Sequence, residues 1–169
     1  MLTGSNSTVA QAPDAGLLNR VLGLWLGLHA RLDGLQPAAA LLARAYVAEA
    51  FFKSGLTKLR DWDITLALFQ DEYKVPLLPT EVAAVMGTGG ELVLPVLLLL
   101  GLGGRLGALG LSVINVVAVL SLTEIAPAAL QQHITWGVLL ASVAIFGNGR
   151  WALDSWLLQR WPVLSRRSR

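Results

Sequence analysis

Cysteine is absent from the 169-residue sequence, and charged residues make up only 14% of it. The absence of cysteine excludes disulfides, thiol catalysis, iron–sulfur ligation by thiolates and c-type haem attachment. Charged residues form about a quarter of an average soluble domain, whereas this chain is 54% hydrophobic. The sequence therefore predicts an integral membrane protein in contact with the lipid bilayer.

The two ends of the chain differ in charge. Residues 1–16 contain neither lysine nor arginine and precede no cleavage pattern, so we expect a disordered N-terminus and no signal peptide. Residues 159–169 form a basic tail, which we assign to the cytoplasmic lipid surface and not to nucleic acid.

Residues 17–36 predict an amphipathic helix, because apolar side chains recur there at spacings of three and four residues. Their uninterrupted apolar part, residues 21–28, is much shorter than the roughly 20 residues that cross a bilayer. We interpret the segment as a helix lying in the membrane interface. Gly34 and Pro37 are expected to break the chain after it.

Four longer apolar segments predict membrane-spanning helices, at residues 38–59, 80–102, 105–123 and 132–148. The loop at residues 60–79 is expected to contain a short surface helix at residues 64–69. The predicted fold class is all-α, an integral membrane four-helix bundle over residues 37–158 with an N-terminal interfacial amphipathic helix. Lysine and arginine gather on the side of the two ends, which places both termini in the cytoplasm.

Ionisable side chains at membrane depth are functional candidates, because each is unfavourable there unless it is paired or hydrated. Glu49, Glu91 and Asn115 are placed near the membrane midplane by counting along the spans. Lys53 follows Glu49 by four residues and is expected to pair with it, either structurally or as part of a site. Glu91 has no partner in its own helix and is the strongest acid–base candidate.

The first predicted span carries two polar stripes on opposite sides. One contains Arg44 and Lys58 and the other contains Glu49 and Lys53. Arg44 and Lys58 lie near the ends of the span, so we expect both to extend toward the membrane surfaces.

Four further residues were placed by their position in the predicted spans. Arg44 and Arg105 fall at the level of Asp154, which could bridge them. His133 opens the last span and is a candidate ligand-binding residue. No clustered ligands for a metal or haem are expected around it. Five tryptophans are interpreted as interfacial anchors, namely Trp62, Trp136, Trp151, Trp156 and Trp161.

Four motifs in order resemble the DoxX family of small four-helix membrane proteins. Arg44 precedes the run FFKSGLTKL at residues 51–59, and Val75-Pro76 precedes the second span. Glu91 is followed by LLLLGLGGR at residues 97–105, and GNGRWALD occupies residues 147–154. The resemblance covers residues 42–158 and implies a bacterial inner-membrane subunit of quinol-oxidising or thiosulfate:quinone-oxidising systems, or of complexes that handle oxidative stress.

The leading hypothesis is a quinone-interacting subunit of a membrane oxidoreductase. Glu91 and Glu49 would exchange protons, while Lys53 and Asn115 would contact the ligand. A protein partner would carry the electron-transfer cofactor, and a homo-oligomer is a further expectation. A small proton-coupled transporter remains open, as does a structural assembly factor that depends on close helix contacts at Gly87, Gly90, Gly107 and Gly110.

Overall fold

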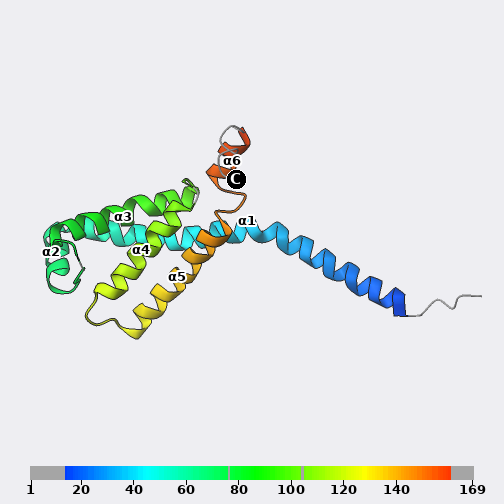
Figure 1. The fold of residues 1–169 in the computed structure, drawn as a ribbon, viewed down its shortest axis with the longest axis horizontal. Helices are drawn as coiled ribbons and strands as arrows, with labels where there is room; N and C mark the ends of the chain where they lie inside the picture. Colours follow the sequence, from blue (N-terminus) through cyan, green and yellow to red (C-terminus); the bar gives the residue numbers. More distant parts are fainter. Residues whose placement is uncertain (1–13, 76, 104, 161–169) are drawn as a thin grey trace, which may run out of the picture. The chain divides into compact units, whose positions relative to one another are not determined.

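The computed structural model describes residues 14–75, 77–103 and 105–160, and the regular secondary structure of these residues is helical (Figure 1). The all-α class is thus confirmed. The predicted tail at residues 161–169 and the first thirteen residues of the predicted disordered N-terminus lie outside the described residues. The helices are α1 (Asp14–Arg60), α2 (Trp62–Asp71), α3 (Thr80–Leu100), α4 (Leu106–Ser121), α5 (Pro127–Phe146) and α6 (Leu153–Arg160).

The chain divides into two compact units, residues 1–36 and residues 37–169. In the first unit the described part is helical, and every side chain from position 16 to position 36 is exposed. The predicted break at Gly34 and Pro37 is wrong, because helix α1 continues through Pro37. A proline inside a helix removes one hydrogen bond and costs about 3 kcal/mol, but the alanine- and leucine-rich run after it strongly favours helix.

The second unit is organised around one hydrophobic core to which four helices contribute. Helix α4 packs between α3 and α5, and α2 packs against α3 (Figure 1). The buried core residues are Val47, Ala48 and Phe51 of α1, Leu98 of α3, Ala108 and Leu111 of α4, and Leu140 and Val143 of α5. The core thus joins the four segments that the sequence marks as apolar.

Close approach of α3 and α4 depends on Gly107. A β-carbon at this position would lie 2.9 Å from the backbone nitrogen of Leu98, inside normal contact distance. Small residues at a helix contact let the two backbones meet, as is common between membrane helices.

Among the described residues, two helices are long and apolar enough to cross a membrane, α3 with 21 residues and α5 with 20. Helix α4 is equally apolar but has 16 residues. The predicted start of the last span at residue 132 is wrong, because α5 begins at Pro127. Proline is favoured in the first turn of a helix, where its missing N–H needs no partner. Helix α6 was not predicted.

Candidate functional site: a charged pair in an apolar cavity

Helix α2 is held over the end of α1 by hydrogen bonds at its first turn. The Asp61 side chain accepts a hydrogen bond from the Ile64 N–H at 3.0 Å, which caps the helix. The buried Thr65 hydroxyl donates to the Lys58 carbonyl at 2.8 Å. Phe69 then packs on Ala83 and Ala84 of α3. These contacts place α2 beside Lys58.

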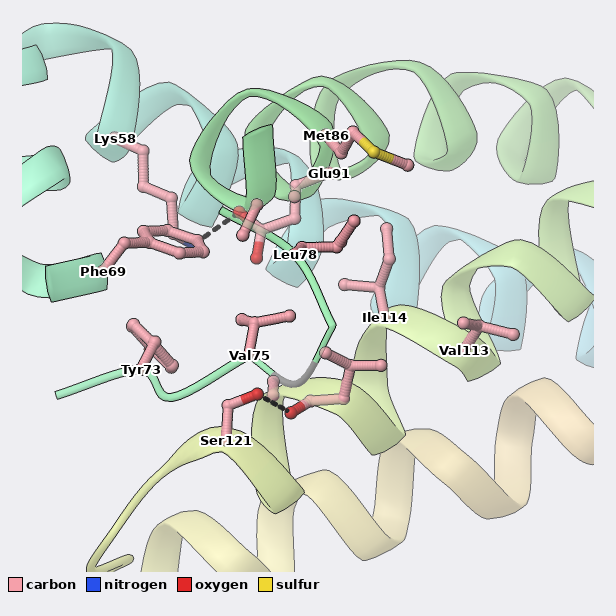
Figure 2. A pocket seen from close by; sticks show the side chains of 14 residues that line it. Lys58, Phe69, Tyr73, Val75, Leu78, Met86, Glu91, Val113, Ile114 and Ser121 are labelled. Carbon is pink, nitrogen blue, oxygen red and sulfur yellow. Dashed lines mark hydrogen bonds and ion pairs between the residues drawn. The ribbon is translucent and has the colours of Figure 1, made fainter. Parts of the chain in front are cut away.

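The segment after α2 is fastened to the end of α4. Tyr73 and Leu122 form an isolated antiparallel bridge, and the Lys74 N–H donates to the Ser121 carbonyl at 2.9 Å. The chain therefore crosses from α2 to α4 before it enters α3. Val75 and Leu78 of this segment lie over the space between α3 and α4 (Figure 2).

A cavity of about 200 Å³ lies beneath this segment. Its wall is apolar except for four polar side chains, Lys58, Tyr73, Glu91 and Ser121. The apolar lining is Phe69, Val75, Leu78, Ala83, Met86, Gly87, Val113, Ile114, Val117 and Ala118. Figure 2 shows these side chains around one space, with Lys58 and Glu91 joined at its edge. Most ligand sites have this composition, an apolar wall with a few placed polar groups.

Lys58 and Glu91 form an ion pair inside the second unit. The Lys58 Nζ lies 2.6 Å from the Glu91 Oε2 and also donates to the Ser54 Oγ at 2.9 Å. Only 12% and 10% of the two side chains are exposed. The expectation that Lys58 extends to the membrane surface is therefore wrong. Glu91, unpaired within its own helix, takes its partner from α1.

Glu49 and Lys53 pair as their spacing predicts, with 2.6 Å between the Lys53 Nζ and the Glu49 Oε1. Their side chains are 63% and 72% exposed. Glu49 lines a separate apolar groove together with Phe52 and Pro95. Glu49 and Glu91 therefore face different spaces.

Asn115 and His133 bind each other between α4 and α5. The Asn115 Nδ2 donates to the His133 carbonyl at 2.9 Å, and the His133 Nδ1 lies 2.8 Å from the Asn115 Oδ1. Asn115 is buried and does not line the cavity of Glu91. His133 meets Trp136 edge to face and Phe51 meets it at a tilt, with ring centroids 5.1 and 5.3 Å from it. Trp136 is thus partly buried against the core.

Arg44 is fully buried, contrary to the expectation that it extends to the membrane surface. Its guanidinium donates to the carbonyls of Leu99 at 3.2 Å and of Trp151 at 2.9 Å. It also binds the carbonyls of Leu98 and Ala40, both at 3.4 Å. Arg44 therefore ties the C-terminal end of α3 to the segment before α6.

Asp154 and Arg105 both lie near the place where Arg44 joins the end of α3 to the segment before α6. The Asp154 Oδ1 accepts from the Gly103 N–H at 3.3 Å, and the Asp154 N–H donates to the Gly101 carbonyl at 3.2 Å. Arg105 is exposed at the start of α4. Gly101 has φ of 67°, and a β-carbon there would lie 2.5 Å from the Arg44 Nη1. The turn after α3 thus requires glycine.

Tyr73 is the cavity residue that sequence reasoning missed. It lies in a loop, and its only sequence signal is a lone aromatic residue among charged neighbours just before the second predicted span. Burial, followed by the negative charges of Glu91 and Glu72, raises the pKa of Tyr73. A phenol is protonated at neutral pH even at its ordinary pKa of about 10, so the Tyr73 hydroxyl is available as a hydrogen-bond donor.

We expect Glu91→Gln to bring the pKa of Tyr73 back toward its ordinary value of about 10. The only other tyrosine is Tyr46, so a Tyr46→Phe background isolates Tyr73 in an absorbance titration. Since folding raises this pKa, the folded chain binds more protons than the unfolded chain above pH of about 10. The stabilisation by Tyr73 is complete below that pH and is lost as pH rises further. An unchanged titration in Glu91→Gln would mean that the two groups do not interact.

Within the described residues no three histidine, aspartate or glutamate side chains are arranged to hold a metal ion. The polar groups of the cavity are instead two opposite charges, a phenol and a hydroxyl. They can donate hydrogen bonds, accept them and hold a proton in an apolar space.

Polar residues enclosed between apolar helices are typical of membrane proteins that handle protons or bind ligands within the bilayer. The chain belongs to the DoxX family, which matches residues 39–124. Proteins of this family are membrane-associated, and such a chain contacts lipid. The match contains every residue of the cavity, whereas His133 and Asp154 lie outside it.

The chain is also similar to a Haemophilus influenzae protein described as "Uncharacterized protein". The two are 28% identical over 145 residues, which cover 80% of this chain and 94% of the relative. No solved structure matches the chain.

Proposed function

We propose that this DoxX protein is a quinone-binding subunit of a membrane oxidoreductase in the bacterial inner membrane. The observation that carries the proposal is the Lys58–Glu91 pair in the wall of an otherwise apolar cavity. In this proposal the second half of α1 together with α3, α4 and α5 crosses the bilayer, with both termini in the cytoplasm.

The cavity suits a small ring with an apolar tail. Its volume of about 200 Å³ is below the range of about 300–1,000 Å³ usual for whole ligands, so it would enclose a headgroup only. Met86 and Val113 line it while remaining 61% and 62% exposed. The cavity wall thus continues onto the exposed apolar surface, where a tail could lie among lipid chains.

Each polar side chain has a distinct role at this site. The Lys58 ammonium donates to Ser54 and Glu91 and has one further N–H to offer to a ring carbonyl oxygen. The Tyr73 hydroxyl lines the same cavity and can donate a second hydrogen bond. Glu91 can accept a proton from a ring hydroxyl or return one.

A bound quinone couples electron transfer to the uptake or release of protons. The residues described here supply the proton side of that chemistry. Since the sequence has no cysteine, thiol chemistry is not available, and we assign the electron-transfer cofactor to a partner subunit.

A photoreactive short-chain quinone analogue tests the proposal on the purified protein. We expect labelling near Tyr73 or Glu91 that unlabelled quinone displaces. Glu91→Gln and Lys58→Met should each weaken binding by about tenfold, the equivalent of one lost hydrogen bond. Glu49→Gln is the matched control, since Glu49 lies in another groove, and it should bind normally.

Two results would contradict the proposal. One is equal labelling of the wild type and Glu91→Gln. The other is proton flux in proteoliposomes that depends on Glu91 without any quinone binding, which would instead identify a transporter.

A further inference from the structure

The exposed side of α1 in the second unit carries a regular stripe of residues. Ala39, Leu42, Tyr46, Glu49, Lys53 and Leu56 alternate spacings of three and four residues, and all six are exposed. We call this set the α1 stripe. Alternating spacings of three and four are the seven-residue repeat by which two helices pack along a common seam.

The same repeat runs through the sequence of the first unit without a change of register. There it consists of Leu18, Val21, Trp25, Leu28, Leu32 and Leu35, all of which are exposed. An isolated helix with an uncovered apolar face is only marginally stable in water. This face therefore needs a covering partner.

The seven-residue period of the repeat indicates whether a second helix or a flat lipid surface covers this face of α1. A straight helix has 3.6 residues per turn, so a strict seven-residue repeat drifts by about 20° each time. Over the 17 positions from Ala39 to Leu56 the drift would reach about 50°, which turns the α1 stripe away from a flat surface. A left-handed pair of helices removes this drift, because both helices wind around the seam.

The charges of the Glu49–Lys53 pair are complementary to those of the same pair in a second copy of the chain. The Glu49–Lys53 pair is 63% and 72% exposed, and Glu49 borders the apolar groove that Phe52 and Pro95 line. Facing lipid, this pair would be unfavourable. Two copies in one membrane have the same orientation, so their α1 helices run parallel and bring two Glu49 and two Lys53 side chains together. The four charges then sum to zero.

We propose that two copies of this chain associate in parallel along the α1 stripe. In the dimer each Glu49 contacts the Lys53 of both copies, and this charged layer fixes the register of the seam. Polar layers of this kind specify register and number of strands in coiled coils. The dimer is independent of quinone binding, since the cavity of Glu91 does not include the stripe.

Cysteine cross-linking of the full-length protein in native membranes tests the seam directly, because the chain has no cysteine of its own. Under mild oxidation we expect Leu42→Cys and Leu28→Cys to shift from 18.0 kDa to twice that mass. The matched control is Leu120→Cys on α4, since Leu120 is 73% exposed and Leu42 is 70% exposed. It should remain at the mass of one chain.

Three results would overturn the dimer. They are a single-chain mass for Leu42→Cys, equal cross-linking of Leu42→Cys and Leu120→Cys, or cross-linking of Leu42→Cys to a protein of another mass. The last result would assign the stripe to a different partner.

Charge exchange tests the Glu49–Lys53 layer between copies. Glu49→Lys alone or Lys53→Glu alone brings four like charges together and should reduce Leu42→Cys cross-linking by at least about tenfold. Differently tagged copies, one with Glu49→Lys and the other with Lys53→Glu, should cross-link to each other as well as the wild type does. If Glu49 and Lys53 interacted only within one chain, mixing the two variants would not restore cross-linking. Absence of mixed dimers would therefore refute the charged layer between copies.

Discussion

Arg44→Ala is expected to lower the free energy of unfolding by about 3–5 kcal/mol, among the largest effects of any single substitution in this chain. Arg44 is fully buried, and its guanidinium donates hydrogen bonds to carbonyls at the end of α3 and before α6. Its loss leaves buried acceptors without partners and removes a positive charge from the C-terminal end of a helix. The melting temperature in detergent should fall by about 10 °C.

Two further variants serve as comparisons for the melting temperature of Arg44→Ala. Arg105→Ala removes an exposed arginine at the other side of the same turn and should change the melting temperature little. Arg44→Lys keeps the charge but loses the planar set of donors, so an intermediate loss is expected. If Arg44→Ala melted no lower than Arg105→Ala, the carbonyl contacts would not be stabilising.

Glu91→Leu and Lys58→Met should each destabilise the protein by about 3–5 kcal/mol, while the double variant should lie close to the wild type. Each single change leaves one charge in a space where only 10–12% of the side chain is exposed. The double change removes both charges and fills the cavity wall with apolar groups of similar size. Thermal unfolding of the four proteins as a double-mutant cycle measures the coupling.

The double variant also separates folding from function. It should retain the fold and yet fail to bind the quinone analogue, because its cavity lacks the charged donor and the carboxylate. If it were as unstable as the single variants, the pair would act by more than mutual neutralisation. If it bound quinone normally, the Lys58–Glu91 pair would be structural only.

Helix positions in the second unit could be predicted from local patterns. The predicted segments at residues 80–102 and 105–123 match α3 and α4 closely, because long apolar runs ended by glycine or charge leave little choice. The continuity of α1 through Pro37 could not be predicted in this way. The penalty of one proline competes with helix-forming residues on both sides, and their balance is not visible in a local motif.

The candidate site was predicted only in part. Glu91 could be singled out because a carboxyl group in an apolar run stands out, and it lines the cavity. Lys58 was misplaced because a long side chain near a helix end can reach either a membrane surface or the interior. Tyr73 was missed because its role depends on a loop that crosses from α2 to α4.

For the charged residues of α1, the sequence determined which of them share a side of the helix, and the tertiary structure decided which side is buried. The sequence alone separated α1 into two polar sides, one with Arg44 and Lys58 and the other with Glu49 and Lys53, since helical periodicity fixes which residues share a side. Only the packing of α2 and α3 decided that the first side is buried and the second exposed. Periodicity is a property of one helix, whereas burial depends on which neighbours that helix meets.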